Sequence, residues 1–205
     1  MELIDIYDEG GVHIGVADRN VAHTFGLWHK TVHCWVVLKD GRVVFQRRSR
    51  RLQDNPGKLY TTASGHISAG ETCETSLFRE VEEEVGITPS DPKLITRGPW
   101  TADFPKKDGS MYKDRVVFTM YFCRYDGPIE SFRFKDGEVD GAVAMEIDDI
   151  LRLAEGKTDK IPAIEFDGKE VKEIMVGEQD FVLTGHETLE SKFATWFRRI
   201  RELSE

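Results

Sequence analysis

Four glutamates fall within five positions of the stretch FREVEEEVGI, residues 78–87. At about 100° per residue on an α-helix, Glu80 and Glu84 lie one above the other and Glu83 lies close beside them, while Glu82 points to nearly the opposite side. Like charges at this spacing destabilise an isolated helix by about 0.2–0.5 kcal/mol per pair. Two interpretations follow: the glutamates form a solvated acidic face, or three of them hold a cation.

A helix is the element that must position these carboxylates. Leu77, Val81 and Val85 recur every four residues, so the three clustered glutamates flank an apolar, buried face. We predict that the helix runs from Thr72 to Val85 and stops where Gly86 takes the C′ position. Carboxylates on one rigid helix suit Mg²⁺, which prefers oxygen ligands in octahedral geometry and retains several waters.

The residues before the helix extend the pattern. The constrained positions are Gly65, after five residues Glu71, after seven residues Arg79-Glu80, then an apolar residue, one further residue, Glu83-Glu84, one residue, Gly86 and the apolar Ile87. This spacing resembles the Nudix box, G-x5-E-x7-R-E-U-x-E-E-x-G-U with U apolar, at every defined position. The resemblance implies a metal-dependent hydrolase with Mg²⁺ or Mn²⁺ as cofactor. Such an enzyme cleaves a diphosphate linkage in a nucleoside diphosphate derivative or a similar small organic diphosphate.

The chemistry of diphosphate hydrolysis gives these residues roles. A hard divalent cation neutralises the phosphate oxygens and lowers the pKa of a bound water. Glu80 and Glu84 are our first candidates for metal ligands, and Glu83 is a further ligand or the base for the attacking water. Gly65 lets the backbone pass close to the metal, where its carbonyl is a candidate ligand.

Other residues complete the candidate site. Glu71 and Arg79 are expected to form an ion pair that ties the loop to the helix. Glu138 precedes a predicted strand and matches a position where other Nudix proteins place a distant carboxylate near the metal, so it is a further candidate ligand. We expect two aromatic residues to lie on a loop, where their rings can stack on a substrate base. The candidate substrate contacts are these two, Trp100 and Phe104, together with Arg47 and His66.

A longer stretch, residues 27–71, is similar to the Nudix subgroup that includes isopentenyl-diphosphate isomerase, and residues 1–150 fit that subgroup. The resemblance implies an α/β fold, an αβα sandwich around a mixed β-sheet with a β-rich N-terminal extension. The isomerases bind a metal through histidines that we match to His23, His29 and His66. For these histidines two interpretations stay open, a second metal site and ordinary hydrogen-bonded side chains near the pocket.

Departures from the isomerase pattern favour hydrolysis. The catalytic Cys of the isomerases falls on Ser64 of this chain. Their acidic E-x-E falls near Asp114-Arg115-Val116, where the second glutamate is absent, and their Nudix box is degenerate whereas this one is intact. Two alternatives stay open: an isomerase-like activity on a prenyl diphosphate, and a module that binds diphosphates without turnover.

Periodicity and turn signals predict mixed strands with interspersed helices in a single domain, residues 1–205. Hairpins are expected in residues 2–19, at Asp40-Gly41, a dipeptide that suits a type I′ turn, and at the FDGKE stretch, residues 166–170. A buried strand is expected in residues 114–128, a strand with a short helix in 137–156, and a helix in 188–203. The parts we distinguish are an N-terminal β extension (1–30), the Nudix box (65–87) and a C-terminal extension ending in a helix (151–205).

The chain is acidic, with a formal net charge of −9. This argues against a nucleic-acid or anionic-membrane partner, because basic surfaces largely hold both. Cys34, Cys73 and Cys123 are far apart with no CxxC, so we expect no disulfide framework or zinc knuckle, and a reducing compartment fits. The acidic N-terminus lacks the pattern of a signal peptide, so we predict a cytoplasmic protein. The expected partner is a small diphosphate substrate, and a homodimer is the commonest closed assembly.

Overall fold

The computed structural model describes residues 1–106, 108–135, 137–183 and 187–204. Its N-terminal part is an antiparallel pair of strands, β1 (Leu3–Tyr7) and β2 (His13–Asp18), followed by the helix α1 (Arg19–Phe25). Asp18 caps this helix by accepting a hydrogen bond from the backbone N–H of Asn20 at 2.8 Å. The hairpin predicted for this stretch is confirmed, whereas α1 was not predicted.

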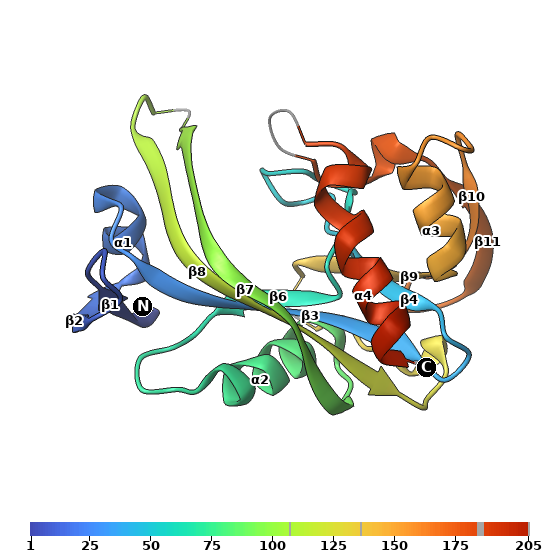
Figure 1. Ribbon diagram of the computed structural model, residues 1–205, viewed down its shortest axis with the longest axis horizontal. Helices are drawn as coiled ribbons and strands as arrows, with labels where there is room; N and C mark the ends of the chain where they lie inside the picture. Colours follow the sequence, from blue (N-terminus) through green and yellow to red (C-terminus); the bar gives the residue numbers. More distant parts are fainter. Residues whose placement is uncertain (107, 136, 184–186, 205) are drawn as a thin grey trace.

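A nine-stranded sheet forms the centre of the molecule (Figure 1). Its strands are β3 (His29–Leu38), β4 (Val43–Arg48), β5 (Leu59–Tyr60), β6 (Ala63–His66), β7 (Ser90–Pro105), β8 (Met111–Tyr125), β9 (Val139–Met145), β10 (Ile161–Phe166) and β11 (Val171–Val176). The main path runs β11-β10-β9-β4-β3-β8-β7, with β5 paired to β4 and β6 paired to β3. Because β3 pairs antiparallel with β4 and β6 but parallel with β8, the sheet is mixed, as predicted.

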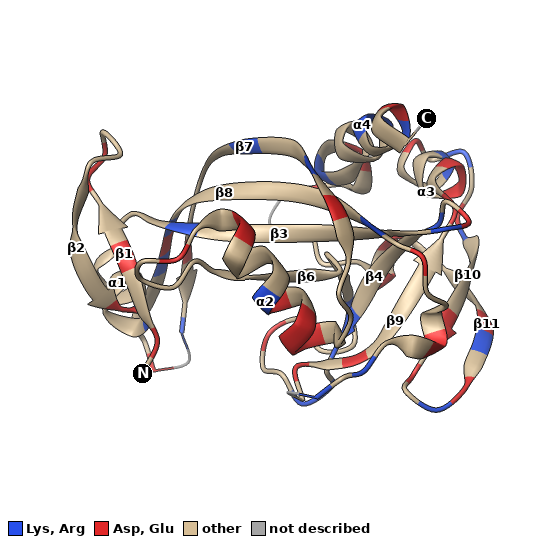
Figure 2. Ribbon diagram, turned by 90° about the horizontal axis from the view of Figure 1, so that it is seen from below, with Lys and Arg blue, Asp and Glu red and all other residues tan. Residues whose placement is uncertain are grey.

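Helices cover both faces of this sheet and complete the predicted αβα sandwich. The helix α2 (Cys73–Val85) lies on one face, and α3 (Ile147–Ala154) and α4 (Thr195–Ser204) lie on the other (Figures 1 and 2). Side chains alternate along β3, so Cys34 and Val36 pack in the core under α2, whereas Trp35 and Val37 pack in the core under α3 and α4.

The helix α2 agrees with its prediction. Thr72 is its N-cap and forms a capping box with Thr75, whose backbone N–H donates to Oγ1 of Thr72 at 3.1 Å. Gly86 ends the helix in the left-handed conformation, with φ 65°. Because the apolar stripe of α2 is buried against the sheet, the helix is held in a fixed orientation and so are the glutamates beside the stripe.

The turn between β3 and β4 differs from its prediction. A type I′ turn requires a positive φ at both central residues, but only Gly41 of the Asp40-Gly41 pair has one, at 90°. The N–H of Gly41 donates to the carbonyl of Leu38 at 2.9 Å, and the N–H of Leu38 donates to the carbonyl of Arg42 at 2.9 Å. The hairpin is confirmed, and its loop is longer than the two residues of a type I′ turn.

The loop predicted around Trp100 and Phe104 is wrong, because both residues lie on β7. Trp100 pairs with Val116 of β8, and Phe104 pairs with Tyr112. The segment resembles a loop in sequence because it contains Pro92, Pro99, Pro105 and Gly98. Proline is tolerated at the edge of a sheet, where its missing N–H breaks no ladder, and β7 is an edge strand.

The C-terminal third forms a hairpin and the helices of the second layer. The strands β10 and β11 pair antiparallel around Gly168, which has φ 87°, so the hairpin predicted at FDGKE is confirmed. A π-helical turn, Glu190–Ala194, leads into α4, where a helix was predicted. Every helix within the described ranges is too short or too polar to cross a lipid bilayer.

Candidate active site

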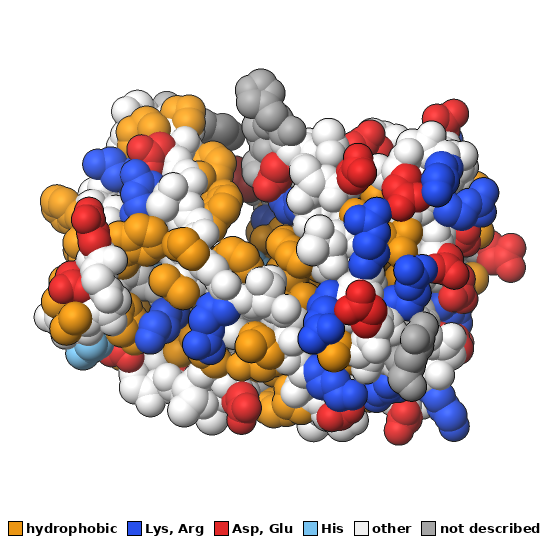
Figure 3. All heavy atoms as spheres, in the orientation of Figure 1, with side chains coloured by type: hydrophobic (Ala, Val, Ile, Leu, Met, Phe, Trp, Pro, Cys, Tyr) orange, Lys and Arg blue, Asp and Glu red, His pale blue; other side chains and the backbone are white. Residues whose placement is uncertain are grey.

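A cavity of about 1380 Å³ opens on the surface of the protein. Its walls come from α2, the face of β3 and β8, the strand β7, the segment between Arg48 and Ser68, and the C-terminal segment that leads into α4. Figure 3 shows that the surface is hollowed between the arm formed by β7 and β8 and the C-terminal helices. All four clustered glutamates line this cavity: Glu80, Glu83 and Glu84, which were predicted to hold a cation, and also Glu82, which was expected to point to the other side of the helix.

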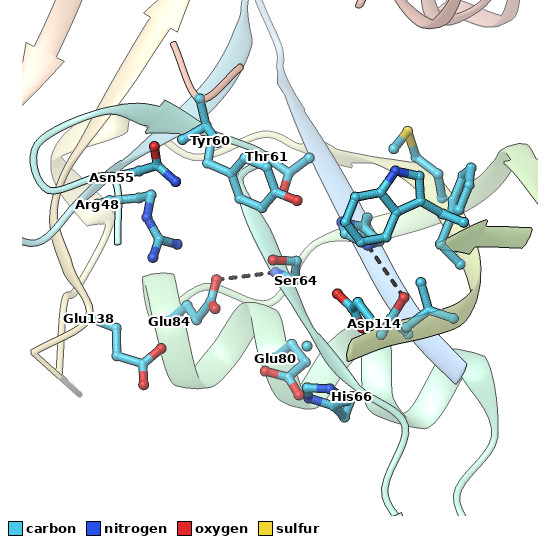
Figure 4. Close-up of a pocket in the computed structure, with 18 of the residues that line it drawn as sticks. Arg48, Asn55, Tyr60, Thr61, Ser64, His66, Glu80, Glu84, Asp114 and Glu138 are labelled. Carbon is cyan, nitrogen blue, oxygen red and sulfur yellow. Dashed lines mark hydrogen bonds between the residues drawn. The ribbon is translucent and has the colours of Figure 1, made fainter. Parts of the chain in front are cut away.

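Glu84 is the most enclosed of the three carboxylates. Its Oε2 accepts a hydrogen bond from Nε2 of Gln46 at 2.9 Å and another from the backbone N–H of Ser64 at 3.2 Å (Figure 4). These donors hold the carboxylate of Glu84 against β4 and β6. Figure 4 shows Arg48 and Glu138 on the same side of the cavity as Glu84.

Glu80 lies directly against the backbone of Gly65. A Cβ built on Gly65 would stand 2.1 Å from Cδ and Oε1 of Glu80, so only glycine leaves room for this carboxylate. Burial raises the pKa of Glu80 to about 7, although the guanidinium of Arg79 opposes that rise. Nη1 of Arg79 donates to Oε1 of Glu80 at 2.8 Å.

Arg79 connects the loop and the helix at this point. Its Nη2 donates to Oε2 of Glu71 at 3.1 Å and to the backbone carbonyl of His66 at 3.1 Å. Its Nη1 also donates to Oε2 of Glu83 at 3.1 Å. Glu83 remains the most accessible carboxylate of the cluster, with 56% of its side chain exposed. Arg79 therefore holds three glutamates together, and the ion pair expected with Glu71 is present.

The arrangement of carboxylates suits a divalent cation. The cavity wall carries the three glutamates of α2 that were predicted as ligands and Glu138, which reaches it from the segment before β9. Because Gly65 has no side chain, the carboxylate of Glu80 lies directly against its backbone. A metal bound by Glu80 can therefore come close to that backbone. Carboxylates are the ligands that Mg²⁺ and Mn²⁺ prefer. Glu82 also lines the cavity, and it accepts a hydrogen bond from Nζ of Lys135 at 2.9 Å.

Three histidines gather beside the cavity, and one of them, His66, lines it. A set of ring nitrogens from His23, His29 and His66, one from each, lies within 4.8 Å of one another. Nδ1 of His29 is 2.9 Å from the carbonyl of Leu27 and donates to it, so its Nε2 carries the lone pair. Among the described residues, neither this Nε2 nor Oδ1 of Asp114 has a hydrogen-bond partner, although both are buried and lie 3.8 Å apart.

The electrostatics of this cluster fit a metal better than a set of charged imidazoles. Burial lowers the pKa of His23 to about 4 and that of His66 to about 2, so both rings are neutral near pH 7. Burial raises the pKa of Asp114 to about 6. Neutral imidazoles with one carboxylate form a donor set typical of transition-metal sites. The sequence had left this site open, and the geometry supports it.

Two of the four predicted substrate contacts line the cavity and two do not. Trp100 and His66 line the cavity. Phe104 is exposed on β7 and is not part of the described cavity wall, and its ring lies 6.2 Å from that of Trp100. Arg47 bonds to Glu165 and to the carbonyl of Gly57, so the structure does not bring it to the cavity.

Three kinds of residue at the site were not predicted from the sequence: two that line the cavity and one, Gln46, that holds Glu84. Arg48, one position beyond Arg47, lines the cavity because side chains alternate along β4. Gln46 is a buried polar residue in the otherwise apolar start of β4, a signal that could have been noticed. The third kind comes from the C-terminal segment, where helical periodicity gives no indication that Lys192 and Trp196 face a cavity.

Comparison with known proteins agrees with this geometry. The model of the NUDIX domain family matches residues 27–165. An uncharacterized Nudix hydrolase of Clostridium acetobutylicum is 34% identical over 163 residues, 78% of this chain and 77% of that protein. An isopentenyl-diphosphate Delta-isomerase of Streptomyces griseus is 32% identical over 89 residues, 43% of this chain and 45% of the isomerase.

Solved structures share the fold. A MutT protein from Methanosarcina mazei superimposes with a TM-score of 0.51 at 17% identity, covering 87% of this chain and 96% of that one. A Deinococcus radiodurans protein superimposes with a TM-score of 0.52 at 21% identity, covering 76% and 90%. From the family match and the relatives, the chain belongs to the Nudix family.

Proposed function

We propose that this protein hydrolyses the diphosphate linkage of a small organic diphosphate, using Mg²⁺ or Mn²⁺ held by Glu80, Glu83 and Glu84, with Glu138 as a further ligand. The observation that carries the proposal is the convergence of these four carboxylates on one cavity, with the carboxylate of Glu80 directly against the backbone of Gly65. A cation bound there neutralises the diphosphate oxygens and makes a bound water more acidic.

Other side chains have separate roles in the hydrolysis. The water oxygen forms a bond to one phosphorus, the anhydride P–O bond breaks, and the bridging oxygen leaves with the other phosphate. Glu83 accepts the proton of the water because it is the most exposed carboxylate of the cluster and faces incoming solvent. Arg48 supplies positive charge to the phosphates from the side of the cavity that also carries Glu84 and Glu138. Arg79 keeps Glu80 and Glu83 in place through its paired hydrogen bonds.

A panel of diphosphates tests the proposal. Nucleoside diphosphates and triphosphates, nucleotide sugars, dinucleotides and prenyl diphosphates are incubated with Mg²⁺ or Mn²⁺, and released phosphate or nucleotide is measured. We expect one class to be cleaved well above the rest, with activity lost in EDTA and restored by the metal. Turnover in chelator, or binding of every compound without cleavage, would contradict the mechanism.

The histidine cluster supports a second metal, separate from the carboxylate site. We propose that a transition metal is bound by His23, His29, His66 and Asp114. The metal stabilises the packing of the N-terminal helix α1 against the sheet. Elemental analysis of the purified protein is the test. We expect one equivalent of metal in the wild type and much less in His29→Ala, whereas Glu84→Gln should retain it.

Isomerisation of a prenyl diphosphate is the alternative that the relatives raise. Ser64 and Val116 occupy the positions where the resemblance places the isomerases' catalytic Cys and the second carboxylate of their acidic pair. The backbone N–H of Ser64 binds Glu84, and Val116 is a buried apolar residue of the cavity wall. Formation of the dimethylallyl isomer from isopentenyl diphosphate, without release of phosphate, would favour the isomerase.

A further inference from the structure

Two histidines of the cluster carry the proton of the ring on Nδ1. Nδ1 of His29 donates to the carbonyl of Leu27 at 2.9 Å. Nδ1 of His23 lies 3.3 Å from the carbonyl of Lys113, and because a carbonyl only accepts, this nitrogen is the protonated one. In a neutral imidazole the other nitrogen carries a lone pair, so Nε2 of both rings is ready to bind a metal.

His66 carries its proton on the opposite nitrogen. Its Nε2 lies 3.1 Å from Nε2 of His23, and because the latter carries a lone pair, the proton between them belongs to His66. Nδ1 of this neutral ring therefore carries the lone pair, and it faces Oε1 of Glu2 at 3.6 Å. No proton lies between these two atoms, which accounts for a separation longer than that of a hydrogen bond.

Glu2 is held in this position by Arg19. The backbone N–H of Arg19 donates to the carbonyl of Glu2 at 2.9 Å, and its Nη1 donates to Oε2 of the same residue at 3.1 Å. Because Arg19 binds Oε2, the other carboxylate oxygen is directed at His66. Glu2 and Arg19 both line the cavity, and both precede residue 27, where the match to the family model begins.

The proton of His66 must change its position when the cluster holds a metal. An imidazole binds a metal through a lone pair, and the nitrogen of His66 that faces the ring of His23 is the protonated Nε2. The proton therefore leaves Nε2, and Nδ1 takes up one proton in its place. The ring stays neutral with no net release of a proton, and its new N–H points at the carboxylate of Glu2.

We propose that Glu2 is a positioning residue of the histidine site, whose carboxylate accepts the Nδ1–H of His66 and thereby keeps Nε2 of that ring available as a ligand. The inference rests on the transition metal proposed for this cluster, and Glu2 itself is not a ligand. A carboxylate behind a metal-bound histidine fixes the orientation of the ring and makes the ligand nitrogen more basic. The carbonyls of Leu27 and Lys113 orient the other two rings without adding a negative charge.

An ordinary surface ion pair is the competing interpretation. The side chains of Glu2 and Arg19 are 36% and 47% exposed, and exposed pairs of this kind contribute little to stability. If Glu2 served only to pair with Arg19, its replacement would leave metal binding at the cluster unchanged. Metal affinity therefore separates the two interpretations.

The test titrates Zn²⁺ calorimetrically into the full chain, with Mg²⁺ in excess so that the carboxylate site does not compete. We expect Glu2→Ala to bind Zn²⁺ at least about 10-fold more weakly than the wild type, as loss of a carboxylate behind a ligand does in other metal sites. The melting temperature of the metal-free variant should stay nearly unchanged. Glu2→Gln should lose less affinity, because its amide oxygen can still accept from Nδ1.

The matched control is Glu9→Ala. Glu9 is an exposed carboxylate in the turn between β1 and β2 that does not line the cavity, so its removal changes the charge of the same N-terminal part. This variant should bind Zn²⁺ as tightly as the wild type.

NMR of the imidazole nitrogens provides a second measurement that needs no variant. His66 should carry its proton on Nε2 in the metal-free wild type and on Nδ1 with Zn²⁺ bound. Equal Zn²⁺ affinity in the wild type and Glu2→Ala, or a proton on Nε2 of His66 in the Zn²⁺-bound protein, would overturn the inference and leave the second metal in place. A wild type that binds no Zn²⁺ at the cluster would overturn both. Hydrolysis at the carboxylate site is tested separately, by the substrate panel.

Discussion

The carboxylate of Glu80 occupies the space that a side chain at Gly65 would need, 2.1 Å from the Cβ position. Gly65 does not have a positive φ, so alanine fits its backbone and only the flexible end of Glu80 must move. We expect Gly65→Ala to fold with little loss of stability. A displaced ligand should nevertheless reduce kcat by about 100-fold, as a misplacement of about 1 Å can do in an active site.

Steady-state kinetics and thermal unfolding of the same preparation check this prediction. Gly98→Ala is the matched control, because its new Cβ would meet the ring of Phe118 at an ordinary contact distance of 3.8 Å. Similar kinetics for both variants would mean that the contact between Gly65 and Glu80 has no part in the reaction.

Glu84→Gln removes one negative charge and keeps the shape of the side chain. The remaining oxygen can still accept from Ser64 and Gln46, so the fold should persist, while activity should fall by more than about 100-fold because the cation site is weakened. Added Mg²⁺ should raise the melting temperature of the wild type by mass action, and much less that of Glu84→Gln.

Glu74→Gln is the control for this pair of measurements. Glu74 is exposed in the first turn of the same helix and does not line the cavity. If the acidic helix were only a solvated face, the two variants would show equal activities and equal responses to Mg²⁺.

No thiol takes part in the proposed reaction. Cys34 and Cys123 are buried in the core and Cys73 is partly buried on α2, and none of the three lines the described cavity. We therefore expect Cys34→Ala, Cys73→Ala and Cys123→Ala each to keep kcat within about threefold, less than 1 kcal/mol of barrier. A collapse of kcat in a variant that melts normally would point to isomerase-like chemistry.

Stability should fall in mild acid because His33 is buried in its neutral form. Its pKa is lowered from 6.5 to about 4 on folding, so between these values the unfolded chain binds a proton that the folded chain excludes. The free energy of unfolding therefore decreases as pH falls from 6.5 towards 4, by up to about 1.4 kcal/mol per pH unit for one histidine. Urea unfolding at pH 7, 6 and 5 measures it.

The variant His33→Gln isolates this contribution from the other buried histidines, which titrate in the same direction. Its stability should depend less steeply on pH than that of the wild type over this range. Parallel pH profiles for the two proteins would show that His33 is free to take up a proton in the folded state.

The prediction from the sequence was most accurate for α2, where the residues that form the helix and the candidate metal ligands belong to one short segment. The stripe of Leu77, Val81 and Val85, with the stop at Gly86, specifies a helix locally, and a helix alone puts Glu80, Glu83 and Glu84 on one side. Nothing local brings Glu138 beside Glu84, so that placement depended on the family resemblance.

Local signals misled where tertiary context decides. The prolines of β7 indicate a loop, yet an edge strand accommodates them, so Trp100 was predicted at the cavity for the wrong structural reason. Arg47 and Arg48 are adjacent and chemically identical, and only the pairing of β4 determines which one faces the cavity. Lys192 faces the cavity because the π-helical turn that carries it packs on the sheet through Phe193, a long-range contact that no local pattern records.

The two strands at the ends of the sheet also bear on how this protein behaves at high concentration. β7 carries Pro92, Pro99 and Pro105, each of which removes one N–H donor from the edge, and β11 carries the charged residues Lys172 and Glu173. A strand from another molecule that tried to extend the sheet would lose ladder hydrogen bonds at one end and bury charges at the other. A nine-stranded sheet with open ends is thereby protected against growth into fibrils.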